Sequence, residues 1–136
     1  MATLNPVQIR YYGWSALSIE TAHGPMFFDP FYRHYCGAQW FGLDDFARAK
    51  VVCVTHGHEE HFLDTPAVVK RSGATVVAHR AVTDYLRWRY RVPAAQLQPV
   101  PNGTTVEVPG FKASTFTWKH RDINLYKALT KAVFHG

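Results

Sequence analysis

Three histidines and two glutamates occupy six consecutive positions of the sequence, in the order H-x-H-x-E-H from His56 to His61. Imidazole nitrogens and carboxylate oxygens are the ligands that a borderline divalent cation such as Zn²⁺ accepts in proteins. His56 and His58 can point to one side and bind one ion, whereas Glu60 and His61 diverge toward a second position. The spacing differs from the helical pattern H-E-x-x-H, because His58 and His61 lie three residues apart. We interpret the stretch as a metal-binding loop; the alternative is a polar surface loop rich in histidine.

A buried strand is expected to position this loop. Residues 51–55 read VVCVT, a run of apolar and β-branched residues that is typical of a strand and stops where the histidines begin. A second histidine position follows a predicted hairpin of residues 104–108 and 111–118, which ends just before His120. The alternative for His120 is an exposed strand-end histidine beside two basic residues.

The remaining sequence alternates strand and helix patterns. Strands are predicted at residues 7–11, 16–21 and 26–29, forming a β-meander that exits at Asp29-Pro30. Helices are predicted at residues 44–50, 65–71, 81–90 and around 124–133, with a strand at 74–78; Thr65 is expected to cap its helix and Pro66 to begin it. This order indicates an α/β fold with a mixed sheet. The aromatic stretch 32–42 either lines a substrate pocket or packs as a flap on the core.

Composition restricts the class of protein. With 136 residues, of which 47% are hydrophobic, the chain is expected to be one globular domain rather than a disordered segment. Cys36 and Cys53 lie far apart and form no redox or metal motif, which fits a reducing cytoplasm. The first residues contain no apolar signal region, and no apolar run approaches the roughly 20 residues that span a bilayer. We therefore expect a cytoplasmic protein without a membrane partner.

The net charge of +5 favours acidic partners without choosing among them. The basic residues are densest at Arg80, Arg87, Arg89 and Arg91, where tyrosine and tryptophan are interleaved. Such a stretch could meet nucleic acid, but a solvated helix face with packed aromatic side chains is the favoured interpretation. The expected partner is a small-molecule substrate rather than nucleic acid.

The histidine motif resembles that of the metallo-β-lactamase fold superfamily, H-x-H-x-D-H, with Glu60 in place of the aspartate. Five pieces of the sequence follow the order and spacing of one branch, the small metal-dependent hydrolases similar to ascorbate-6-phosphate lactonases: residues 12–15 (YGWS), 28–31 (FDPF), 54–58 (VTHGH), 72–77 (SGATVV) and 116–120 (FTWKH). Trp14 is a departure, because many relatives have histidine there. The resemblance covers nearly the whole chain, and the metal motif is its specific part.

The resemblance implies a set of site residues. The first metal position would use His56, His58 and His120, and the second would use Glu60 and His61. Glu60 would also act in catalysis as a proton acceptor, while Asp29 and Asp64 would support the ligands without touching the metal. The expected cofactor is one or two divalent ions, with Zn²⁺ favoured and Mn²⁺ or Fe²⁺ compatible. We expect His23, His34, His79 and His135 to be structural or surface residues.

The resemblance also implies that residues 1–136 form a single, incomplete domain, the N-terminal half of an αβ/βα sandwich with helices on one face of a mixed sheet. We therefore expect one sheet face to be uncovered, and either a missing C-terminal half or a second copy of the chain to complete the site. With only two ligands of the second position present, at most one well-held ion and low or no turnover are expected. The implied activity is hydrolysis of a small ester, lactone or phosphodiester by metal-activated water. The alternatives are a nuclease of the same superfamily and a non-catalytic metal-binding or assembly module.

Overall fold

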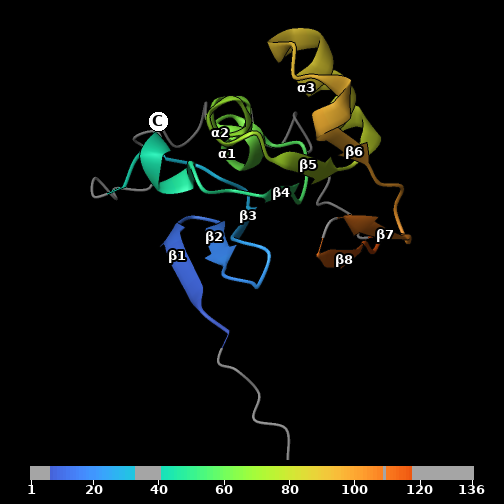
Figure 1. Ribbon diagram of the computed structural model, residues 1–136. Coiled ribbons are helices and arrows are strands. Elements are labelled where there is room, and N and C mark those ends of the chain that lie inside the picture. Colours follow the sequence, from blue (N-terminus) through green and yellow to red (C-terminus); the bar gives the residue numbers. More distant parts are fainter. Residues whose placement is uncertain (1–6, 33–40, 109, 118–136) are drawn as a thin grey trace, which may run out of the picture.

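The computed structural model describes residues 7–32, 41–108 and 110–117 and contains a six-stranded sheet and a separate two-stranded hairpin (Figure 1). The strands of the sheet are adjacent in the order of the sequence. They are β1 (Ile9–Gly13), β2 (Ala16–Ile19), β3 (Met26–Phe28), β4 (Val51–Val54), β5 (Thr75–Ala78) and β6 (Leu97–Pro99). Among the described residues, no helix is long and apolar enough to cross a membrane.

The sheet is mixed, as the sequence predicted. Strands β1, β2 and β3 pair antiparallel, whereas β3, β4, β5 and β6 pair parallel. Parallel strands all end at the same edge, so the residues that follow β3, β4 and β5 meet there. Those residues are Asp29, the Thr55–His58 loop and His79.

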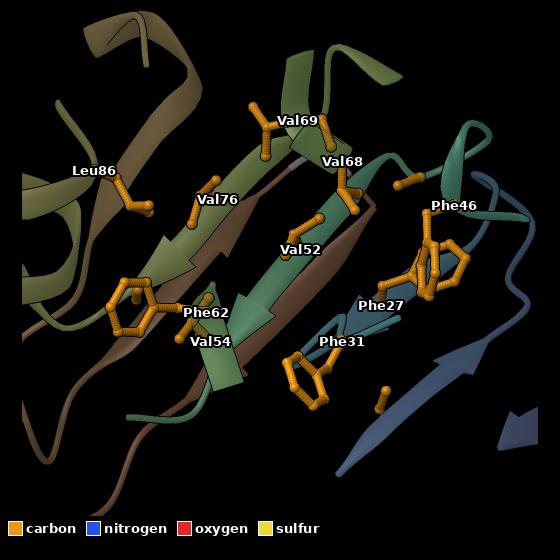
Figure 2. Close-up of a cluster of buried hydrophobic side chains, with 14 of the residues drawn as sticks. Phe27, Phe31, Phe46, Val52, Val54, Phe62, Val68, Val69, Val76 and Leu86 are labelled. Carbon is orange, nitrogen blue, oxygen red and sulfur yellow. The ribbon is translucent and has the colours of Figure 1, made fainter. Parts of the chain in front are cut away.

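Helices cover one face of the sheet (Figure 1). They are η1 (Leu43–Phe46), α1 (Glu59–Phe62), α2 (Thr65–Ser72) and α3 (Arg80–Tyr90), followed by the short turn η2 (Ala94–Gln96). In the core between them, Val52 and Val76 of the sheet pack with Val68 and Val69 of α2 (Figure 2). Each of these valines is at most 1% exposed, so α2 and the loop before it are held firmly over the sheet.

The opposite face is partly covered, which corrects the expectation that it would be bare. The hairpin of β7 (Thr105–Val108) and β8 (Phe111–Ser114) lies below the sheet in Figure 1 and forms a second apolar cluster with it. This cluster contains Val51 and Val77 of the sheet together with Val100 and Val108. The hairpin covers the side near β5, because Val108 reaches the row formed by Val51 and Val77.

Several predicted boundaries were wrong for local reasons. The helix expected at 44–50 is the single 3₁₀ turn η1, whose Phe46 is fully buried in the core. Asp64 rather than Thr65 is the N-cap residue of α2. β8 ends at Ser114 rather than at residue 118, and beyond it the Thr115 amide donates one more hydrogen bond to the Thr104 carbonyl. The strand β6 was not predicted, and the helix expected around 124–133 lies outside the described residues.

Candidate metal centre

The loop after β4 brings two imidazole rings together. β4 ends at Val54, and His58 is the N-cap residue of α1, so the chain turns sharply between them. His56 Nε2 and His58 Nδ1 are 3.1 Å apart. Ligand nitrogens that lie 2.0–2.1 Å from a tetrahedral zinc ion are separated by about 3.3 Å. The two histidines that were predicted to share one ion therefore have their ring nitrogens at nearly the separation that such an ion requires.

His61 belongs to the same cluster. It lies on α1, and its ring centroid is 3.9 Å from that of His56. His61 was predicted to contribute to a second position, and the short helix α1 places its ring beside that of His56. The ring is fixed on its other side, where His61 Nδ1 lies 2.8 Å from Asp29 Oδ2. The Nδ1 proton is donated to this carboxylate, which leaves Nε2 as the nitrogen with a free lone pair.

Asp29 is buried, and its carboxylate forms hydrogen bonds that connect the segments at the edge of the sheet. It is 2% exposed, and Oδ1 accepts a hydrogen bond of 2.7 Å from the backbone amide of Thr55, while Oδ2 accepts one of 2.7 Å from the Thr55 hydroxyl. The backbone of Asp29 is left-handed, with φ of 43°, a conformation that aspartate tolerates better than most residues. Strain of this kind clusters at functional sites. Asp29 thus connects the end of β3, the loop after β4 and His61.

Thr55 transmits the effect of Asp29 to His56. The Thr55 hydroxyl donates its proton to Asp29, so toward His56 Nδ1, 3.0 Å away, its oxygen can only accept. His56 therefore carries its proton on Nδ1 and presents an unprotonated Nε2 toward His58. One buried carboxylate fixes the tautomers of two histidines, one directly and one through a hydroxyl group.

Thr55 and Ser15 contact the histidines, although no role was predicted for either residue. Ser15 Oγ lies 3.0 Å from His61 Nδ1, although 46 positions separate the two residues. The turn between β1 and β2 places Ser15 there, and no local pattern could have indicated it. The sequence could have indicated a role for Thr55, because a hydroxyl residue directly before a strand-end histidine is well placed to form a hydrogen bond with the histidine ring.

The other predicted site residues have different surroundings. Asp64 is fully buried, and its Oδ2 accepts a hydrogen bond of 2.8 Å from the backbone amide of Tyr32, which ties the start of α2 to the segment after β3. Glu60 is half-buried in the first turn of α1. His120 lies outside the described residues. The roles predicted for these three residues stay predictions.

Within residues 7–32, 41–108 and 110–117, no group of three or more histidine, cysteine or acidic side chains is arranged to enclose a metal ion. Whether these residues suit a metal ion is therefore judged from the chemistry of the histidine nitrogens that could bind it. His56 and His58 have converging ring nitrogens, and His56 and His61 have tautomers set by Asp29 and Thr55. A carboxylate behind a ligand histidine is the arrangement that metal sites commonly use. These residues fit part of a divalent metal site.

The cluster opens into a cavity of about 1010 Å³ on the hairpin side of the sheet. Polar side chains of Ser15, Asp29, His56, His61 and His79 lie at the edge where β3, β4 and β5 end, and the body of the cavity is mostly apolar. Its apolar lining includes Leu17, Ile19, Phe28, Cys53 and Val77. A substrate held there would have its reactive group near the histidines and its remaining atoms against the sheet.

Cys53 lines this cavity as a neutral thiol. Burial, with a further contribution from the charge of Asp29, raises the pKa of the Cys53 thiol from 9.0 to about 12. Near pH 8 the thiolate fraction is then about a thousandfold lower than for an ordinary cysteine. We expect iodoacetamide to alkylate Cys53 about a thousandfold more slowly in the folded chain than in urea, as measured by peptide mass spectrometry, which separates Cys53 from Cys36. The folded rate should rise with pH up to about 12, and a plateau near pH 9 would contradict this prediction.

Comparison with known proteins places these observations in a family. The model of the metallo-beta-lactamase superfamily matches residues 48–131, well over half of the chain. A UPF0173 metal-dependent hydrolase of Sinorhizobium medicae is 34% identical over 113 residues, which are 79% of this chain and 45% of that protein. One from a Geobacillus species is 36% identical over 83 residues, covering 61% of this chain and 36% of the relative. The chain spans less than half the length of these relatives.

Solved structures agree on the fold. Igni18, a metallo hydrolase from the archaeon Ignicoccus hospitalis, is similar with a TM-score of 0.64 and 22% identity, covering 76% of this chain and 43% of that one. The metallo-beta-lactamase SMB-1 is similar with a TM-score of 0.51 and 23% identity, covering 75% of this chain and 47% of that one. At this identity the likeness concerns the fold, and it confirms the predicted α/β class.

Proposed function

Because the chain belongs to the metallo-β-lactamase superfamily, we propose that it forms part of a metal-dependent hydrolase that acts on an ester, lactone or phosphodiester of a small molecule. The observation that supports this most directly is the pair of converging nitrogens, His56 Nε2 and His58 Nδ1, beside a histidine held by a buried carboxylate. The relatives described as metal-dependent hydrolases support the same class of activity. The lactone is the finer part of the proposal and rests on the motif resemblance alone.

We assign the first metal position to His56, His58 and His120, and the second to Glu60 and His61. The remaining ligands of the second position would come from a further segment of the protein or from a second copy of the chain. A divalent ion, which we propose to be Zn²⁺, would polarise the scissile group and lower the pKa of water toward about 7. Mn²⁺ or Fe²⁺ would suit the same ligands.

The chain's own residues prepare the site before a substrate arrives. Asp29 holds His61 through Nδ1, and Thr55 holds His56 through Nδ1, so both rings present Nε2. Glu60 is placed one residue before His61 and is the carboxylate that we propose as proton acceptor. The apolar wall of the cavity excludes water from the body of the substrate and leaves its reactive end near the histidines. We propose a cytoplasmic location because Cys53 is a free thiol.

Metal loading followed by activity measurement tests the proposal. Metal-free chain is titrated with Zn²⁺, Mn²⁺ and Fe²⁺ by calorimetry, and each loaded form is assayed with nitrophenyl esters, a homoserine lactone and bis-nitrophenyl phosphate. We expect about one ion per chain and hydrolysis of one substrate class that a chelator abolishes. If none of the three ions binds above the level of a denatured control, the proposed function is wrong. If an ion binds and no substrate is hydrolysed, the non-catalytic alternative replaces it.

A further inference from the structure

The outer side of α3 presents two neighbouring rows of side chains. Arg80 and Arg87 are seven residues apart and lie on one side of the helix, and Arg91 follows as the C-cap residue with a left-handed backbone; these three residues are called the arginine row. Tyr85 and Trp88 are three residues apart and form a second row beside it. The buried residues Val82, Thr83 and Leu86 lie on the side that faces the sheet. Figure 1 shows α3 on the helix-covered side of the sheet, away from the hairpin.

Two aromatic side chains of this helix are exposed, whereas Tyr90 packs against the core. Trp88 is 75% exposed and Tyr85 is 41% exposed. The rings are nevertheless organised, because the Tyr85 centroid lies 5.7 Å from Phe62, 6.3 Å from Trp88 and 6.0 Å from Tyr90. Part of the expected aromatic packing is present, because Tyr90 packs against the core and Tyr85 contacts Phe62, but the indole of Trp88 is left open to solvent. A large exposed indole beside arginines indicates a binding surface.

The charge of this surface is strongly positive. Residues 80–91 contain four arginines and a single acidic residue, Asp84. Asp84 lies 3.5 Å from Arg80, with both side chains at least 66% exposed, so this ion pair is weak. Arg89 lies over the ring of Tyr90, 5.5 Å from its centroid. Arg87 and Arg91 are exposed at the end of the helix beside Trp88.

We propose that the outer side of α3 binds single-stranded nucleic acid, with phosphates along the arginine row and bases stacked on Tyr85 and Trp88. A positively charged track beside aromatic side chains is the combination that binds single strands without sequence preference. Arg80 and Arg87 lie about 10 Å apart along the helix, and Arg91 follows at its C-terminal end, so the row can contact more than one phosphate. A duplex fits less well, because its bases are already stacked on one another and cannot cover the exposed rings.

An anionic membrane is the alternative partner for a basic, aromatic helix. Interfacial helices bury a broad apolar face into the lipid, supplied by leucine, phenylalanine and tryptophan. The apolar aliphatic residues of α3, Val82 and Leu86, are instead buried in the core. Its outer side offers aromatic rings, arginines and one aspartate, which matches stacked bases and phosphates more closely than lipid tails.

The test is fluorescence anisotropy with labelled 12-nucleotide probes, oligo-dT and oligo-rU, on the whole chain in the presence of a chelator. We expect binding to both probes, weaker binding to a duplex of equal length, and affinity that falls steeply with salt. Trp88→Ala should weaken binding about tenfold, whereas Trp88→Phe should keep most of the affinity. Arg87→Gln should lower the salt dependence by about 0.7 in slope. Arg48→Gln, a 74% exposed arginine outside α3, is the matched control and should change little.

Three results would overturn the proposal. The first is the absence of binding at low salt. The second is binding that Trp88→Ala and Arg87→Gln leave unchanged. The third is binding to phosphatidylserine vesicles, weakened by the same two variants, without binding to either probe. The chelator separates this test from the proposed hydrolase, because the outer side of α3 needs no metal. Loss of metal binding would therefore leave this proposal standing, and loss of probe binding would leave the hydrolase standing.

Discussion

Replacement of His56 by alanine is expected to reduce the metal bound to the chain from about one ion to background. Thr55 fixes the tautomer of His56, so that its Nε2 is unprotonated. This nitrogen lies 3.1 Å from His58 Nδ1. Loss of an outer partner of a ligand typically weakens metal binding by roughly 10–100-fold. Loss of the ligand itself should exceed that range, because the nitrogens that remain no longer converge on one point.

Element analysis after dialysis, together with zinc calorimetry, measures this effect. His79→Asn is the matched control, since His79 follows β5 much as His56 follows β4, and asparagine can still cap α3. The control should keep its metal, and circular dichroism should show that both variants fold. Full stoichiometry with unchanged affinity in His56→Ala would exclude His56 as a ligand and would remove the main support for the proposed function.

The part of the site that sequence predicts best is the part formed by consecutive residues. The His56–His61 loop follows an apolar strand, and its ligand types alone indicate a metal. The link between Asp29 and His61 spans 32 positions, and only the parallel pairing of β3 and β4 brings them together. Ser15 is more distant still and is placed by the turn between β1 and β2. Sequence spacing carries no information on such pairs unless the sheet order is already known.

The strands and helices show the same difference between features set by consecutive residues and features set by contacts between distant segments. Strong local patterns predicted β4, β5, α2 and α3 to within one or two residues at most ends. The strand β6 reads LQP and has neither apolar alternation nor β-branched residues, so its pairing with β5 decides its conformation. Packing between distant segments also explains the partly covered sheet face, because Val108 reaches Val51 and Val77 only after the chain has crossed the whole sheet. Tertiary contacts override local preference in both cases.

Replacement of Asp29 by asparagine is expected to weaken metal binding about 10–100-fold while the chain still folds. The carboxylate accepts three hydrogen bonds, from the amide and hydroxyl of Thr55 and from His61 Nδ1. Asparagine has one accepting oxygen and tolerates the left-handed backbone of this position, so strain does not change. If the asparagine oxygen keeps the hydrogen bond from the Thr55 amide, the asparagine NH₂ group faces the Thr55 hydroxyl and His61 Nδ1, and it can only donate to them. The unfolding free energy should fall by about 1–3 kcal/mol.

The consequence for the histidines separates a role at the metal site from a purely structural one. Facing a donor, His61 is expected to accept through Nδ1, to which Ser15 Oγ can also donate, and to carry its proton on Nε2, while the Thr55 hydroxyl is free to donate to His56 Nδ1. Both rings then present a protonated Nε2, which must lose its proton before it can bind a metal, so binding is weakened. Nitrogen NMR of the metal-free chain should show this change of tautomer at both His56 and His61 in Asp29→Asn.

Thr55→Val separates the effect of Asp29 on His61 from its effect on His56, because it removes the Thr55 hydroxyl and leaves the carboxylate in place. His61 should keep its tautomer in this variant, whereas His56 should lose the partner that fixes its own. Metal affinity should then fall less than in Asp29→Asn. If Asp29→Asn lowers stability and leaves both tautomers and the metal affinity unchanged, the carboxylate only holds the sheet edge together. If the tautomers change as expected, a single buried charge at the end of β3 determines which nitrogen each of these histidines presents to a metal.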